Sequence, residues 1–208
     1  MSDSSKYLKA IDRGEFAAIL FDCDGTLAHT AELHHLALAA AIRELGHDMP
    51  KQWYMERTGL SLEQVLDEFA QYCGERLTRP QISPLEERVF CENAGMVREI
   101  TAVTAIARGY SGKVPMAVVS SSARAMVHAT LGALGITQLF NAIVSVEMID
   151  RPKPAPDPYL KAAELLQVDP DKCLVLEDTE EGLRAGRDAG MTTWDIRHLW
   201  EAKPGLEK

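Results

Sequence analysis

Four short stretches of this sequence carry side chains that are suited to chemistry on a phosphorylated molecule. Each stretch follows an apolar run, and together they hold four carboxylates, three hydroxyls and one lysine: Asp22 and Asp24, Ser120 to Ser122, Lys153, and Glu177 with Asp178. Carboxylate oxygens are the ligands that Mg²⁺ prefers, and protein-bound Mg²⁺ is commonly shared with a phosphate. If the four stretches meet in space, they predict a Mg²⁺ site that binds a phosphate group.

The apolar runs indicate how these side chains are positioned. The runs at 16–21, 116–119, 142–144, 173–176 and 191–194 lack polar alternation, and helical patterns at 123–134, 158–166 and 180–189 separate the later ones. Buried strands that alternate with helices predict a parallel sheet covered on both faces. Ligands of such sheets bind beyond the carboxyl ends of the strands, where the polar stretches follow.

The pattern between residues 30 and 98 is different, because it is helical and contains no predicted strand. Ser61 is the expected N-cap of one of its helices. A later helix is predicted through residues 89–100, with Pro80 and Pro84 marking the approach to it.

This division predicts two domains. Residues 1–29 and 99–208 form a doubly wound, parallel-sheet core of the Rossmann-like α/β class, and residues 30–98 form an all-helical domain inserted after the first strand. The first eleven residues are compatible with an added helix or a loose tail.

Four segments resemble the motifs of the haloacid dehalogenase-like phosphohydrolases. They are FDCDGTL (21–27), VVSSS (118–122), the lysine of RPKPAPDPY (151–159) and the acidic pair of VLEDTEEGLRAG (175–186). They occur in the family's order and at its spacing, each after a predicted strand. The helical insertion resembles the family's helical cap of the first type. The resemblance implies a phosphoric monoester hydrolase whose cap closes over its substrate and excludes bulk water.

The resemblance assigns catalytic roles to four side chains. Asp22 attacks phosphorus and forms an aspartyl-phosphate, and Asp24 protonates the leaving oxygen and then activates the hydrolytic water. Ser120 hydrogen-bonds an oxygen of the transferring group. Lys153 pairs with that group and with Asp22, which reduces like-charge repulsion.

The same resemblance implies the binding residues. Mg²⁺ is held by Asp22, the backbone carbonyl of Asp24 and Asp178, with Glu177 at the ion or just behind it. Gly25 lets the backbone turn tightly so that amides face the phosphate. The implied substrate-binding residues are Gly25, Thr26, Ser121 and His34.

Each of these residues could instead have a purely structural role. Asp22 and Asp24 also suit a turn, and Glu177 and Asp178 favour the N-terminus of the following helix through its dipole. One of the serines at 120–122 is expected to cap the helix that begins near residue 123.

Within the family, the residues favour a phosphatase. Asp24 argues against a dehalogenase, which has no leaving group to protonate. Thr30 and His34 resemble positions that control the acid/base group or the cap in β-phosphoglucomutases, but Leu62 stands where those mutases carry an arginine for the second phosphate. A phosphomutase of that type is therefore one alternative. A catalytically idle scaffold that binds a phosphorylated metabolite or a protein is another.

The substrate is expected to be a small phosphomonoester. The segments PMAV (115–118), KPAPD (153–157) and TTWDIR (192–197) resemble small sugar-phosphate phosphatases that act on fructose 1-phosphate and 6-phosphogluconate. Trp53 and Tyr54 are interpreted as packing residues rather than as walls of a sugar site.

One residue departs from the family pattern. His29 stands near the linker to the cap, where the family often has an aspartate. It is either a structural replacement or a titratable imidazole that makes cap closure depend on pH between pH 5 and 8.

The composition limits the remaining classes. The 208 residues contain 22 Lys and Arg against 31 Asp and Glu, and the net charge of −9 argues against binding to nucleic acid or anionic membranes. No apolar run approaches the roughly 20 residues of a membrane helix, and the N-terminus lacks the apolar region of a secretory signal. The four cysteines lack CxxC spacing, which favours reduced thiols, with Cys23 in the core. We expect a cytoplasmic monomer or weak dimer that binds a small phosphorylated metabolite.

Overall fold

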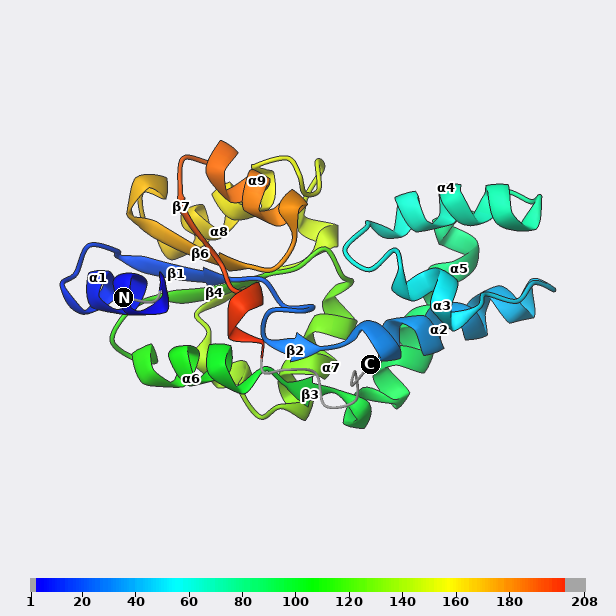
Figure 1. Cartoon of the computed structure of the whole chain (residues 1–208), viewed down its shortest axis with the longest axis horizontal. Coiled ribbons are helices and arrows are strands. Elements are labelled where there is room, and N and C mark those ends of the chain that lie inside the picture. Colours follow the sequence, from blue (N-terminus) through cyan, green and yellow to red (C-terminus); the bar gives the residue numbers. More distant parts are fainter. Residues whose placement is uncertain (1–2, 201–208) are drawn as a thin grey trace.

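The computed structural model describes residues 3–200, and its centre is a five-stranded parallel sheet (Figure 1). Its strands are β1 (Ala18–Phe21), β4 (Met116–Val119), β5 (Ala142–Val144), β6 (Cys173–Glu177) and β7 (Thr192–Asp195). Their order is β5-β4-β1-β6-β7, and all neighbours are parallel. The chain direction across the sheet reverses at β1, since β4 lies on one side and β6 on the other. Doubly wound folds bind ligands at the carboxyl edge of this switch point.

Helices cover both faces of this sheet. One face carries α1 (Asp3–Asp12), α6 (Thr101–Tyr110) and α7 (Arg124–Ala133), and the other carries α8 (Asp157–Leu166) and α9 (Glu180–Asp188). Strand side chains alternate between the two apolar layers, because Ile19 and Phe21 pack in the first and Leu20 packs in the second. The predicted doubly wound α/β core is confirmed, and residues 3–12 form a helix, whereas residues 1 and 2 lie outside the described part of the chain.

Four of the helices that lie between β1 and β4 in the chain pack beside the sheet (Figure 1). They are α2 (Ala31–Glu44), α3 (Lys51–Met55), α4 (Leu62–Cys73) and α5 (Arg79–Glu92). They share an apolar core of their own, which includes Ile42, Phe69 and Ile82. The all-helical insertion is therefore confirmed. A short antiparallel ribbon, β2 (Ala28–His29) with β3 (Arg98–Glu99), joins it to the sheet, and the sequence pattern did not indicate these strands.

The helix predicted through residues 89–100 was wrong in its extent. α5 ends at Glu92, a 3-10 turn and β3 follow, and Ile100 is the N-cap of α6, which was not predicted. Pro84 lies inside α5 rather than ahead of it, where it removes one backbone N–H from the helical ladder. The described 3-10 turns are η1 (Ala94–Met96), η2 (Thr137–Leu139), η3 (Val146–Met148), η4 (Pro170–Lys172) and η5 (Arg197–Leu199).

The helix caps agree with the sequence at one position and differ at another. Ser61 caps α4 as predicted, since its hydroxyl accepts from the backbone N–H of Gln64 and its own N–H donates to the Gln64 side chain. α7 has Ala123 at its N-cap, and the backbone N–H of Arg124 donates to the Glu147 carboxylate at 2.8 Å. The prediction that a serine of 120–122 caps this helix was wrong, because a carboxylate from another loop takes that place.

Among the described residues, no helix combines the length and the apolar character that crossing a membrane requires.

Candidate active site

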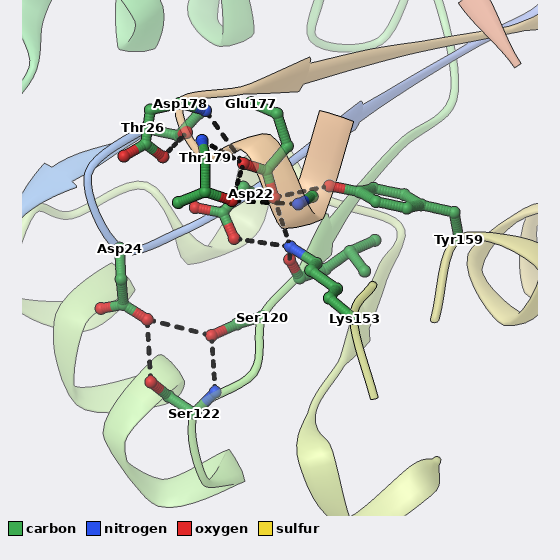
Figure 2. A network of polar contacts seen from close by, with 12 residues as sticks. Asp22, Asp24, Thr26, Ser120, Ser122, Lys153, Tyr159, Glu177, Asp178 and Thr179 are labelled. Atoms are coloured by element: carbon green, nitrogen blue, oxygen red, sulfur yellow. Dashed lines mark hydrogen bonds and ion pairs between the residues drawn. The ribbon is translucent and has the colours of Figure 1, made fainter. Parts of the chain in front are cut away.

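Loops from the ends of β1, β4 and β6 meet at one edge of the sheet around a buried lysine (Figure 2). The Nζ of Lys153 donates to Asp22 Oδ1 at 2.7 Å, to Glu177 Oε1 at 2.7 Å and to the Val119 carbonyl at 3.0 Å. Burial lowers the pKa of Lys153, but the Asp22 and Glu177 carboxylates outweigh burial and raise it. Lys153 is therefore the buried counter-ion of two acids rather than a solvated loop residue.

Both oxygens of Glu177 are engaged by hydrogen bonds. Oε1 accepts from Lys153 and from the Tyr159 hydroxyl at 3.0 Å. Oε2 accepts from the backbone N–H groups of Asp178 and Thr179, both at 2.9 Å, and from the Thr179 hydroxyl. Burial raises the pKa of Glu177, but Lys153 and these donors lower it below its ordinary value. The carboxylate is thus held ionised against Lys153.

Two glycines let the backbone approach these acids closely. Gly25 has a φ of +92°, and a Cβ at this position would overlap the Asp178 carboxylate. A Cβ at Gly182, in the first turn of α9, would overlap the Glu177 carboxylate. Neither position has room for a larger residue, so the tight turn predicted at Gly25 is present and faces an acid.

Three carboxylates form a cluster with the chemistry of a divalent-metal site. One oxygen each of Asp22, Glu177 and Asp178 lies within 4.8 Å of the others. Asp22 Oδ2 is buried and has no hydrogen-bond partner among the described residues, whereas Asp178 Oδ1 accepts from the Thr26 hydroxyl at 2.8 Å. Such hard oxygen donors fit a divalent cation, and the unpartnered oxygen supports that fit. Since Glu177 is fully engaged, Asp22 and Asp178 are the better placed ligands.

Burial, together with the neighbouring acids, raises the pKa values of Asp22 and Asp178. Burial raises the pKa of Asp22 well above its ordinary value, and Lys153 offsets only part of the rise. Burial and the neighbouring Glu177 charge raise the pKa of Asp178 to about 7. A positive charge beside these carboxylates would favour their ionised forms.

Asp24 belongs to a second polar network, on the side of the helical insertion. Its Oδ1 accepts from the Thr30 hydroxyl at 2.8 Å and lies 3.0 Å from His34 Nε2, and its Oδ2 accepts from Ser120 at 3.0 Å and Ser122 at 2.8 Å. Burial raises the pKa of Asp24, but His34 and the hydroxyl donors outweigh it and hold the pKa well below the usual range. The pKa of His34 is raised in turn, because Asp24 outweighs the effect of burial.

The structure therefore sorts the residues singled out from the sequence into two networks. Lys153 joins Asp22 to Glu177, with Asp178 and Thr26 beside them, and Asp24 accepts from Ser120 (Figure 2). His34 belongs to the network of Asp24. Ser121 is exposed and its side chain makes no hydrogen bond to the described residues, so it joins neither network.

Sequence reasoning missed several members of these networks. Ser122, the third serine of its motif, bonds Asp24 directly. Thr179 caps α9 while bonding Glu177, and a threonine at a helix start is a signal that could have found it. Tyr159 reaches Glu177 from α8, and its position in an apolar stripe carries no such signal.

Trp53 and Arg57 of the insertion pack against each other and against neighbouring side chains. Trp53 packs its ring against Phe69 and Tyr72, as expected. The Arg57 guanidinium lies 3.9 Å from the centre of the Trp53 ring and donates to Glu68 at 2.8 Å.

Cys23 and His29 lie near Asp22 and Asp24 in the sequence but outside both networks. Cys23 is buried in the apolar core, as expected, and burial raises the pKa of its thiol. His29 is exposed on the ribbon that leads to the insertion, and its ring lies edge-on to that of Trp200, with 6.1 Å between the centroids.

Comparisons with known proteins agree with this fold. Residues 19–196 match the family described as haloacid dehalogenase-like hydrolase. The chain therefore belongs to that family, and the predicted class of phosphoric monoester hydrolase is confirmed. Fructose-1-phosphate phosphatase YqaB of Escherichia coli is 30% identical over 195 residues, which cover 88% of this chain and 98% of that protein.

Two solved structures are also similar. CbbY from Rhodobacter sphaeroides in complex with phosphate has a TM-score of 0.75 and 26% identity, covering 86% of this chain and 84% of that one. β-Phosphoglucomutase from Clostridium difficile has a TM-score of 0.73 and 21% identity, covering 86% of this chain and 83% of that one. At this identity, the second likeness concerns the fold alone.

Proposed function

We propose that this protein is a Mg²⁺-dependent phosphatase that hydrolyses a small sugar phosphate through an aspartyl-phosphate on Asp22. The observation that carries the proposal is the state of the Asp22 carboxylate. Lys153 bonds one of its oxygens, and the other is buried without a hydrogen-bond partner among the described residues. A buried carboxylate oriented in this way can attack phosphorus through one oxygen while the other binds a metal ion.

Asp24 is the proposed acid and base. Its present donors, which include Thr30 and His34, stabilise the ionised form, so it acts as a base in this arrangement. To protonate the leaving oxygen it must exchange these donors for the substrate. Thr30 and His34 lie at the start of α2, and a movement of the insertion would therefore change the proton affinity of Asp24.

Two other residues are proposed to hold the transferring group. Lys153 supplies the buried positive charge and Ser120 a hydroxyl. The backbone N–H groups of Gly25 and Thr26 donate to the carbonyls of Ala28 and Cys23, so these two residues would shape the turn around the phosphate rather than donate to it. Ser121 is exposed, and among the proposed substrate-binding residues it has the least structural support.

Mg²⁺ is the proposed metal. Asp22 and Asp178 would hold it through carboxylate oxygens and Asp24 through its backbone carbonyl, with Glu177 behind them as the partner of Lys153. When bound, the ion supplies positive charge that stabilises the transferring phosphoryl group.

Residues 30–98 are proposed to be the cap, with boundaries at 29/30 and 98/99 on the β2–β3 ribbon. Two contacts support closure over the site. The Gln64 side chain of α4 donates to Glu181 of α9 at 3.1 Å, and Gly59 lies against Thr179, next to Glu177. Closure would exclude bulk water during phosphoryl transfer.

The substrate is proposed to be of the fructose 1-phosphate or 6-phosphogluconate type. The similarity to fructose-1-phosphate phosphatase YqaB supports the first of these. A phosphomutase needs a second phosphate site, but Leu62 packs against the apolar core of the insertion and Arg57 is bonded to Glu68. These contacts favour hydrolysis over a mutase, and the ordered polar networks favour an enzyme over an idle scaffold.

The proposal is tested by phosphate release from a panel of phosphomonoesters, with Mg²⁺ or with EDTA. The panel holds fructose 1-phosphate, 6-phosphogluconate, phosphoglycolate and β-glucose 1-phosphate, the last also assayed for glucose 6-phosphate. We expect Mg²⁺-dependent release that falls at least about 1,000-fold in Asp22→Asn. Isomer formation without net release would identify a mutase instead, and silence across the panel in the parent would contradict the proposal.

A further inference from the structure

A buried carboxylate lies in the helical insertion, outside both networks described above. Glu86 is only 7% exposed, although it belongs to a charged stretch of α5. It stands one turn from Ile82 and one turn from Phe90, and both neighbours are fully buried. Glu86 therefore occupies the face of α5 that packs against α2, where an apolar side chain would be expected.

The Glu86 carboxylate makes no hydrogen bond or ion pair with the described residues, and it is not among their fully enclosed unpartnered groups, so a ligand can reach it. Phe90, one turn along α5 from Glu86, has its ring 4.7 Å from that of His34 between centroids, and His34 in turn bonds Asp24. Glu86 and His34 come from α5 and α2, which pack against each other, so the acid lies on the side of the insertion that carries His34 to Asp24. A buried acid without a donor is unfavourable, and a ligand that supplies a donor would relieve it.

The cations near Glu86 are already committed to other acids. Those within its reach are Arg79 and His34. Arg79 bonds Glu63 at 2.7 Å, and His34 bonds Asp24 at 3.0 Å. Neither cation is therefore bonded to Glu86.

We propose that Glu86 is a specificity-determining residue that binds a hydroxyl of the leaving alcohol and disfavours leaving groups with a second anionic charge. The inference rests on the proposed phosphatase function and narrows its substrate class to phosphate esters of neutral polyols. A leaving group with hydroxyls supplies the donor that Glu86 lacks. A second phosphate or a carboxylate would meet an acid with no free cation beside it.

The test compares two substrates that differ only at the far end of the chain. Glucitol 6-phosphate ends in a hydroxymethyl group, and 6-phosphogluconate has a carboxylate there. We expect the parent to favour glucitol 6-phosphate at least about tenfold in kcat/KM, and this preference to fall at least about fivefold in Glu86→Gln. The amide of the variant keeps the size of the side chain but removes its charge. Partial unfolding would lower both rates equally and leave their ratio unchanged.

Glu92→Gln is the matched control, because Glu92 is an exposed acid at the end of the same helix. We expect it to keep the parent's ratio. The inference is overturned if Glu86→Gln keeps the ratio within about twofold of the parent, or if the parent favours 6-phosphogluconate. It is also overturned if the parent hydrolyses p-nitrophenyl phosphate but neither sugar phosphate, a result that leaves the phosphatase function standing. Failure on all three substrates would refute the proposed function itself.

Discussion

Replacing Lys153 by methionine should destabilise the protein strongly, because it removes the only ammonium that bonds Asp22 and Glu177 in the described structure. Methionine fills a similar volume but cannot donate. The change leaves two buried carboxylates uncompensated and the Val119 carbonyl without its lysine donor. Removing one partner of a buried ion pair typically costs about 3–5 kcal/mol, and we expect a loss in that range.

The assay is urea unfolding at pH 8 in EDTA, for the parent, Lys153→Met and Lys161→Met. Lys161 is the matched control, since it pairs with Glu164 at 2.9 Å on the exposed side of α8. Such surface pairs contribute about 0–1 kcal/mol, so this variant should unfold close to the parent. A loss for Lys153→Met of less than about 1 kcal/mol would refute the argument that this lysine compensates buried charge.

The loss of unfolding free energy in Lys153→Met should also depend on pH. The pKa of Asp22 is already raised by burial, and loss of Lys153, which lowers it, raises it further. A carboxyl whose pKa is higher in the folded state than in the unfolded state contributes stability at low pH and loses it as pH rises through the folded value. The deficit of Lys153→Met relative to the parent should therefore be larger at pH 8 than at pH 5. An equal deficit at both pH values would contradict this charge-based account.

Two further predictions concern the acids of the same cluster. Gly182→Ala should lose about 1–3 kcal/mol of unfolding free energy and most phosphatase activity, because its Cβ would overlap the Glu177 carboxylate. Gly109→Ala is the control, because the space at its Cβ is open, and it should lose neither. Thermal unfolding and activity assays measure both effects. The pKa of Asp178 is raised to about 7, so the parent in EDTA should lose stability between pH 5 and 8, and Asp178→Asn should lose less. The same variant should need more Mg²⁺ for half-maximal activity, and an unchanged Mg²⁺ requirement would argue against Asp178 as a ligand.

The sheet and the residues at its edge were predictable because their signals are local. Strands such as Cys173–Glu177 are buried at every position and read as continuous apolar runs. Parallel topology then places the ends of β1, β4 and β6 together, which is why Asp22 and Glu177 meet at Lys153 although more than a hundred residues separate the first two.

The elements that were missed lack such signals. The ribbon strands β2 and β3 have two residues each, too few for any periodicity. α6 follows β3 after the single residue Ile100, which was read as the end of an earlier helix, and no helix was predicted over residues 101–110. The cap of α7 comes from Glu147, which approaches from a loop more than twenty residues away, and no local pattern contains it.

Glu86 illustrates a further limit, since burial of a polar residue is decided by packing rather than by its own type. In the sequence it stands beside Glu87 and Arg88 and reads as part of a solvated helix face. The register of Ile82 and Phe90 nevertheless turns position 86 toward α2. A buried acid at this position is unfavourable for folding of the insertion, and the proposed contact of Glu86 with the substrate accounts for its presence. Under the proposed function, the groups at the sheet edge would act on the phosphate, and Glu86 of the insertion would select the alcohol to which the phosphate is attached.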